Sequence, residues 1–153
     1  MIRTLMIAAA VTISAAAEDA QQRLTPAEIE ALAQGGAGAG TSGLEGIRTT
    51  VLSGDPAKSG LYTIRLTVPA GTEIAAHTHS DTRSAVVISG TWYFGYGEKH
   101  EEAALKALPP GSFYTEPPGA PHFARTGAEP VTLYITGTGP TDTAYVNPAD
   151  KPR

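Results

Sequence analysis

The chain has 153 residues, of which 11 are Lys or Arg and 15 are Asp or Glu, so its formal net charge is −4 at pH 7. This length fits one domain around a single hydrophobic core. The mildly acidic composition, without clusters of Lys or Arg, argues against a nucleic-acid partner, because phosphate backbones are bound by basic surfaces. The chain has no cysteine, so disulfide bonds cannot stabilise it.

The N-terminus has the pattern of a secretory signal peptide. Arg3 precedes an uncharged, largely apolar run over residues 4–17, and Glu18 and Asp19 follow it. This run is shorter than the ~20 apolar residues that span a bilayer. We therefore expect residues 1–17 to be a signal peptide that is cleaved after Ala17. The mature protein is then predicted to be periplasmic or secreted, without a membrane contact.

Residues 18–46 are expected to form a short helix and a connector. The sequence Thr25-Pro26-Ala27-Glu28 has the form of a capping box with proline at the first helical position, and it predicts a helix that ends near Ala33. The glycine-rich segment 35–40 follows. We expect it to be a flexible connector rather than a phosphate loop, because no helix start with Lys-Ser or Lys-Thr comes after it.

Residues 47–137 consist mainly of short β-type runs separated by Gly and Pro. Strands are predicted over 47–52, 62–68, 84–89, 91–96, 112–116 and 131–136. Residues 101–108 differ, because their Ala, Leu, Glu and Lys content predicts one or two helical turns. The Pro-rich tail, 138–153, has no core pattern and is expected to wrap around the domain or a neighbouring subunit. The prediction is an all-β, single-domain sandwich or barrel with a short N-terminal helix.

Two segments of this region place histidines at fixed distances from glycines. They read Gly71-x5-His77-x-His79-x3-Arg83-x6-Gly90 and Gly111-x5-Pro117-x-Gly119-x2-His122. Residues two apart on a strand share a face, so His77 and His79 should point the same way. A third imidazole from another strand, His122, would complete a ligand set suited to a first-row transition metal. His100 lies outside both segments, in a polar run, and is expected to be a solvated loop residue.

The two segments resemble the signature motifs of the cupin superfamily. The resemblance covers about residues 61–137, and it implies a small jelly-roll barrel. It also implies a divalent transition metal bound by His77, His79 and His122, with Fe(II) the expected ion and Mn, Ni or Zn as alternatives. A small-molecule ligand or substrate and a homodimer formed through barrel edges are implied as well. Thr126 stands where many cupins have an asparagine that supports a turn.

One position departs from the cupin pattern, because Arg83 stands where most metal-binding members have a glutamate ligand. A guanidinium group has no lone pair for a metal. At an effective dielectric constant of about 20, a +1 and a +2 charge ~4 Å apart also repel by about 8 kcal/mol. Three arrangements remain open. Arg83 lies away from the metal at the rim; it binds a substrate carboxylate in the pocket; or another carboxylate, Glu73 or Glu116, takes the ligand position.

Glu116 is the stronger candidate for the missing ligand. The apolar run 113–115 leads to it, and a buried acid needs a metal or a cation as its partner. Its alternative role is a salt bridge to Arg83 or Arg125. Tyr114 has the same strand parity as Glu116, so its phenol is expected to face the metal, where it can donate a hydrogen bond or a proton.

Two other parity arguments concern the first strand and the aromatic strand. Glu73 has the same parity as His77 and His79, so it is a second acid that could face the pocket. Trp92, Phe94 and Tyr96 alternate on one face of their strand, where they are expected to pack in the core, with stacking on a substrate as the alternative.

The sequence favours a metal-dependent enzyme that acts on a small anionic or oxygenated molecule. No nucleophile dyad or phosphate loop is present, so the chemistry must depend on the metal. Dioxygenase-like and lyase- or isomerase-like reactions both remain open. The alternative is a non-catalytic domain that binds or senses a small ligand, with Arg83 as the anion clamp.

Overall fold

The computed structural model describes residues 21–152 of the chain. The expected signal peptide lies outside these residues. The described part contains one short helix, α1 (Pro26–Glu30), followed by strands and two 3-10 helices, η1 (Glu102–Ala104) and η2 (Pro148–Asp150). None of its helices has the length and apolar character that a membrane span requires.

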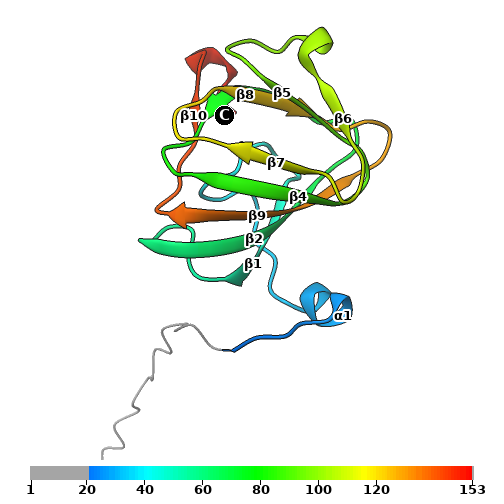
Figure 1. Ribbon diagram of the computed structural model, residues 1–153, viewed down its shortest axis with the longest axis vertical. Coiled ribbons are helices and arrows are strands. Elements are labelled where there is room, and N and C mark those ends of the chain that lie inside the picture. The colour runs from blue at the N-terminus through cyan, green and yellow to red at the C-terminus, as the bar shows by residue number, and fades with distance from the viewer. Residues whose placement is uncertain (1–20, 153) are drawn as a thin grey trace, which may run out of the picture.

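Two antiparallel five-stranded sheets face each other (Figure 1). The first has the order β1 (Arg48–Ser53), β2 (Gly60–Val68), β9 (Val131–Gly139), β4 (Arg83–Ser89) and β7 (Phe113–Glu116). The second has the order β10 (Ala144–Tyr145), β3 (Glu73–Thr78), β8 (His122–Arg125), β5 (Trp92–Tyr96) and β6 (Lys106–Leu108). This confirms the prediction of an all-β, jelly-roll domain with a short N-terminal helix.

The hydrophobic core lies between the two sheets. Alternate residues of β2, from Tyr62 to Val68, are buried as their apolar-polar alternation predicts. They pack with inward residues of the other strands, among them Ala85, Val87, Trp92, Phe94, Tyr114, Ala124, Leu133 and Ile135. This core fills one end of the barrel and leaves the polar residues of the two sequence motifs at the other.

Two local predictions need correction. The capping box forms as expected, because the Thr25 side chain accepts from Glu28 N and the Glu28 side chain accepts from Thr25 N, but α1 already ends at Glu30. In the segment predicted to be helical, only η1 is helical, and residues 106–108 form β6 on the free edge of β5. Strand pairing there satisfies backbone groups and buries Leu108 in the core, which a short isolated helix could not do.

The connector and the tail close one end of the barrel together. Gly35 pairs with Thr49 through two backbone hydrogen bonds, so the glycine-rich segment is anchored rather than free. Residues 40–42, called the connector segment below, pack on the barrel end with Thr41 and Ser42 buried. The tail wraps around the same end, because β10 pairs with β3.

Candidate metal centre

The two sequence motifs bring three histidines to one point inside the barrel. His77 near the end of β3 lies opposite His122 at the start of β8, and His79 follows the end of β3. One ligand atom from each of the three lies within 4.8 Å of the others, and all three side chains are buried. A backbone hydrogen bond of 2.8 Å from Gly119 N to His79 O joins the turn of the second motif to the first.

Each of the three rings is oriented by a backbone carbonyl. His77 Nδ1 lies 2.8 Å from Ala75 O, His122 Nδ1 lies 3.0 Å from Ala120 O, and His79 Nδ1 contacts Asp142 O. A carbonyl only accepts, so Nδ1 of His77 and of His122 carries the proton. His79 Nδ1 also lies 3.3 Å from Arg83 Nη1, which only donates, but its contact with Asp142 O is much closer, so we assign the proton to Nδ1 here as well and the lone pair to Nε2 in all three rings. Among residues 21–152, which the structure describes, His79 Nε2 and His122 Nε2 are buried and have no hydrogen-bond partner. Buried imidazole nitrogens that have a free lone pair and no hydrogen-bond partner are the ligand atoms of a metal site, so these residues fit a metal ion.

The three imidazoles are neutral at physiological pH. Burial lowers the pKa of His77 and of His122 to about 4. Burial, together with the charge of Arg83, lowers the pKa of His79 to about 2. Metal ions bind neutral imidazole, so protons do not compete for these nitrogens near pH 7.

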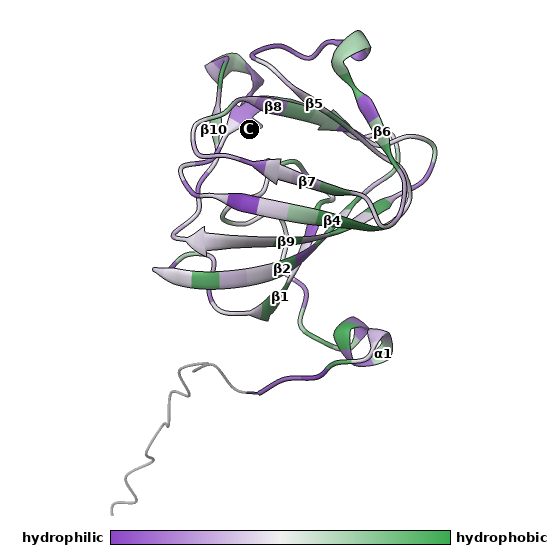
Figure 2. Cartoon of the chain, viewed as in Figure 1, coloured by the Kyte–Doolittle hydropathy of each residue, from purple (hydrophilic) through white to green (hydrophobic). Residues whose placement is uncertain are grey.

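Glu116 and Arg83 complete the cluster, and both are almost fully buried, at 4% and 3% exposure. Glu116 Oε2 lies 3.6 Å from His79 Nε2, and Glu116 Oε1 lies 3.8 Å from His122 Nε2. The expected inward position of Glu116 is therefore found. Figure 2 shows the hydrophilic ends of β4 and β7, which carry Arg83 and Glu116, on the same side of the barrel.

Arg83 does not lie at the rim, so the first of the three arrangements is wrong. Its Nε is 2.7 Å from Glu116 Oε2, an ion contact in which the N–H does not align as a hydrogen bond, and its Nη1 donates to Gly40 O. Burial disfavours the charged guanidinium and is the largest single influence, but the charges of Glu116 and Asp81, together with Tyr62 and Tyr114, outweigh it and raise the pKa of Arg83. Arg125, the other proposed partner of Glu116, instead pairs with Glu102 on the surface.

Sequence reasoning missed a second buried acid, Asp81. It accepts hydrogen bonds from Tyr62 Oη at 2.8 Å and from Thr141 Oγ1 at 2.7 Å. Its negative charge is among the causes that raise the pKa of Arg83. With neutral imidazoles, Arg83, Glu116 and Asp81 leave one net negative charge, which a dication reverses to one positive charge. The sequence offered one signal for this buried acid, because Asp81 lies between His79 and Arg83 in the first motif.

Glu73 lies outside the cluster, contrary to the parity argument. Its side chain is 67% exposed, and its nearest ionic contact is His100 Nδ1, at 3.6 Å. The pairing of β3 with β8 shifts register between Ile74 and His77, which is the sign of a β-bulge. The bulge inverts the side-chain alternation between Glu73 and His77. His100 is also not a solvated residue, because it is largely buried and packs against the Phe123 ring at 5.0 Å.

Tyr114 is buried as its parity predicts, and it packs on Phe94 with 4.2 Å between ring centroids. Burial raises the pKa of Tyr114 well above its usual value, so the phenol remains a proton donor. Phe94 in turn stacks on the His122 ring at 5.4 Å. Thr126 supports a turn, because its hydroxyl accepts from Thr72 N at 2.8 Å and donates to the backbone.

The cavity at the histidines is small, with a volume of about 30 Å³. The connector segment lies over it, together with the inward side chains of both sheets. This space has room for a metal ion with a water molecule, but not for an organic substrate.

Comparison with known proteins places these residues in a family. The family described as "ChrR Cupin-like domain" matches residues 39–142, which include all three histidines. No curated protein sequence matches the chain.

Solved structures share the fold. The polyketide cyclase RemF from Streptomyces resistomycificus is 14% identical, with a TM-score of 0.66 over 87% of this chain and 90% of that one. DMSP lyase DddQ from Ruegeria pomeroyi DSS-3 is 25% identical, with a TM-score of 0.52 over 61% of this chain and 47% of the lyase. A protein of unknown function with a cupin-like fold from Ralstonia eutropha JMP134 is 27% identical, with a TM-score of 0.51 over 63% and 57% of the two chains. The chain thus spans about half the length of the lyase.

Proposed function

Because the chain belongs to the cupin superfamily, through the ChrR cupin-like domain family, we propose that it is a metal-dependent enzyme acting on a small anionic or oxygenated molecule. The observation that supports this most is the pair of buried, unpartnered nitrogens, His79 Nε2 and His122 Nε2, beside a carboxylate oxygen that also has no hydrogen bond, Glu116 Oε2. The proposed ligands are His77, His79, His122 and Glu116. A divalent transition metal at this position supplies Lewis acidity and, as Fe(II), access to oxygen chemistry.

The surrounding residues define the rest of the site. Arg83 Nε lies 2.7 Å from Glu116 Oε2 and holds this carboxyl group in place. Tyr114 presents a protonated phenol on the wall next to Glu116, suited to donating a hydrogen bond to a bound oxygen atom. The guanidinium of Arg83 is already engaged by Glu116 and by the carbonyl of Gly40, so we do not assign it to a substrate carboxylate.

Within this proposal we place lyase- or isomerase-like chemistry before dioxygenase-like chemistry. The reason is the likeness to DMSP lyase DddQ, which is limited to 47% of the length of that protein. One fold can carry many unrelated reactions, so this likeness decides only which of the two reaction classes is tested first.

The experiment begins with the metal content of the purified protein, measured by mass spectrometry. Turnover is then assayed on β-substituted carboxylates, hydroxy acids, sugar acids and diketones, with oxygen uptake followed in the presence of Fe(II). We expect about one ion per chain, and its loss in His122→Ala. The matched control is His100→Ala, which removes the histidine outside the cluster. Equal metal content in the two variants would contradict the site.

A non-catalytic binding or sensing domain is the second candidate. The cavity of about 30 Å³, closed by the connector segment, favours it, because it leaves no room for a substrate beside the metal. Metal binding at full occupancy without turnover of any compound in the panel, and without oxygen uptake, would decide for this function.

Two further proposals concern the state of the protein in the cell. From the N-terminal pattern we propose export with cleavage after Ala17 and a periplasmic or secreted location, which N-terminal sequencing of the exported protein tests. By analogy with other cupins we propose a homodimer, which light scattering tests. A monomeric mass at micromolar concentration would reject the dimer.

A further inference from the structure

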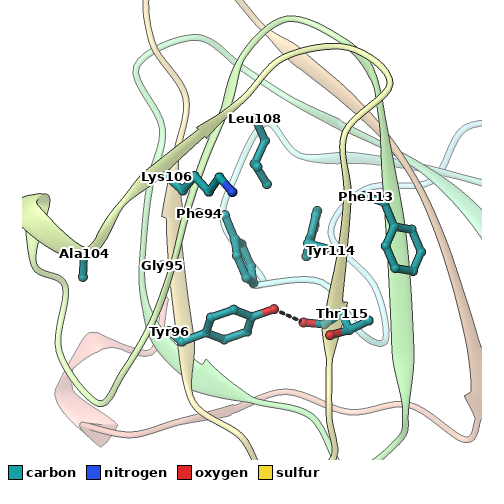
Figure 3. Close-up of a pocket in the computed structure, with 9 residues that line it drawn as sticks. All are labelled: Phe94, Gly95, Tyr96, Ala104, Lys106, Leu108, Phe113, Tyr114 and Thr115. Atoms are coloured by element: carbon teal, nitrogen blue, oxygen red, sulfur yellow. Dashed lines mark hydrogen bonds between the residues drawn. The ribbon is translucent and has the colours of Figure 1, made fainter.

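A second, larger pocket lies on the side of the barrel. Its volume is about 490 Å³, and we call it the side groove. It opens between β6 and β7, each of which is the last strand of its sheet. Figure 3 shows Phe94, Tyr114 and Leu108 inside it, with Phe113 on the β7 side. A hydrogen bond of 2.6 Å from Tyr96 Oη to Thr115 O closes one end of the groove (Figure 3).

The side groove and the metal cavity share a wall. Phe94 and Tyr114 line both spaces. The Phe94 ring contacts Tyr114 on one side and the His122 ring on the other, with centroid distances of 4.2 and 5.4 Å. One layer of aromatic rings therefore separates the groove from the candidate metal ligands. A ligand in the groove can reach the centre if these two rings turn aside.

The lining of the groove indicates the chemistry of its ligand. It is mainly apolar and aromatic, and two of its rings are exposed, Phe113 at 63% and Tyr96 at 54%. Its single charged residue is Lys106, whose side chain extends into the groove in Figure 3. No carboxylate of the described residues lies within 4.0 Å of Lys106 Nζ. Flat apolar surfaces and one unpaired ammonium group suit an aromatic or alkyl carboxylate.

We propose that the side groove binds an apolar carboxylate and is the route by which the substrate reaches the metal centre past Phe94 and Tyr114. The route rests on the proposed function, whereas binding in the groove does not. The connector segment makes the side route necessary, because Arg83, Thr143 and Tyr145 each donate a hydrogen bond to one of its carbonyls and hold it over the barrel end.

Binding is tested with 2-naphthoate as the probe and uncharged 2-naphthylmethanol as its matched control, by calorimetry on the purified protein with and without metal. Ala104 lines the groove and is exposed, so Ala104→Phe fills the groove without disturbing the core. We expect this variant to weaken 2-naphthoate binding by at least about tenfold. Ala103→Phe, its exposed neighbour outside the groove lining, should bind as the wild type does. Equal binding by the two variants overturns the proposal.

The charge is tested with Lys106→Gln, which should weaken 2-naphthoate about fivefold and leave 2-naphthylmethanol unchanged. Lys99→Gln, outside the groove, is the control. No binding of either compound, or a dimer in which the groove is buried by a second copy of the chain, overturns the proposal.

The route is tested by loading the protein with Mn(II) and measuring the broadening of 2-naphthoate proton signals against a Zn(II)-loaded sample. The broadening gives the distance from the ion to the probe protons. Probe protons in contact range of the ion support delivery to the centre, whereas distances that keep the probe in the groove, beyond the Phe94 and Tyr114 rings, overturn it. The two proposals fail separately. A protein that binds 2-naphthoate but holds no metal rejects the metal-dependent function and keeps the groove, whereas a metal-loaded protein that ignores 2-naphthoate rejects the groove alone.

Discussion

Arg83 and Glu116 stand opposite each other in the pairing of β4 with β7, and their side chains meet inside the barrel, with Arg83 Nε 2.7 Å from Glu116 Oε2. Most metal-binding cupins have a glutamate at the position of Arg83. Here the carboxylate belongs to Glu116 on the neighbouring strand β7, and Arg83 contacts that carboxylate. The site thus keeps a carboxylate beside its three histidines and adds a fixed positive charge that the carboxylate must balance.

Replacing Arg83 by methionine should leave Glu116 buried without its cation. We expect the metal-free variant to lose about 3–5 kcal/mol of unfolding free energy, measured by urea denaturation. A dication can then replace the missing charge, so saturating Zn(II) should raise the melting temperature of Arg83→Met more than that of the wild type. Arg125→Met, which removes a surface pair, is the control. A smaller Zn(II) shift in Arg83→Met would contradict the assignment of Glu116 as a ligand.

Replacing Glu116 by glutamine keeps the shape of the side chain and removes its charge. Metal affinity, measured by competition with a chelator, should fall by at least about tenfold, since a neutral amide is a weaker ligand for a divalent ion. Glu102→Gln, in the surface pair with Arg125, should leave the affinity unchanged. The double variant Arg83→Met/Glu116→Gln should be more stable than Arg83→Met alone, because it removes the uncompensated charge. Additive losses of stability would show that the two side chains are not coupled.

The metal-free protein should lose stability as the pH falls. The pKa values of His77 and His122 are lowered to about 4, and that of His79 to about 2, by burial. In the unfolded chain these groups titrate near about 6.5. Below that pH the unfolded state binds more protons than the folded state, so stability is fully present above about pH 6.5 and declines progressively toward lower pH.

The measurement is the urea midpoint between about pH 7 and pH 5, where most carboxylates stay ionised. His77→Ala should flatten the dependence, and His100→Ala serves as the control outside the cluster. A wild-type midpoint that is constant over this range would show that the three imidazoles are not held neutral.

The connector segment should open when Gly40 is replaced by alanine. Gly40 has φ of +72°, and a Cβ there would lie 2.5 Å from Thr141 Cγ2 and 2.9 Å from Arg83 Nη1. We expect a loss of about 1–3 kcal/mol, faster amide exchange over residues 40–46, and faster metal release to a chelator. Gly38→Ala is the matched control, because a Cβ at Gly38 meets nothing within 4 Å. Unchanged exchange in Gly40→Ala would mean that the connector does not close the site.

The sequence predicted the barrel and the convergence of the histidines because glycine and histidine spacing reflects local turns and strand faces. It also predicted the inward side of Tyr114 and Glu116, since β7 is regular. Glu73 was misplaced because a β-bulge, which depends on the partner strand, inverts the alternation before His77. The strand at residues 106–108 was missed for a similar reason, because local composition favours helix and only the free edge of β5 makes a strand there.

Contacts between distant segments were beyond the reach of spacing arguments. The burial of Thr41 and Ser42 depends on hydrogen bonds from Thr143 and Tyr145, about a hundred residues away. Asp81 is held by Tyr62 and Thr141, which no motif connects to it. The side groove exists because two sheets end next to each other, and sheet order cannot be read from one chain's periodicity.

The orientation of His79 has a consequence for the order of events during biosynthesis. Its Nδ1 contacts the carbonyl of Asp142, which is 63 residues further along the chain. The ribosome must therefore add these residues before the ring is fixed, and by then His77 and His122 have already been made. The three-histidine site is complete only when the whole barrel has folded. A metal ion can therefore meet all three oriented histidines only after synthesis has passed Asp142.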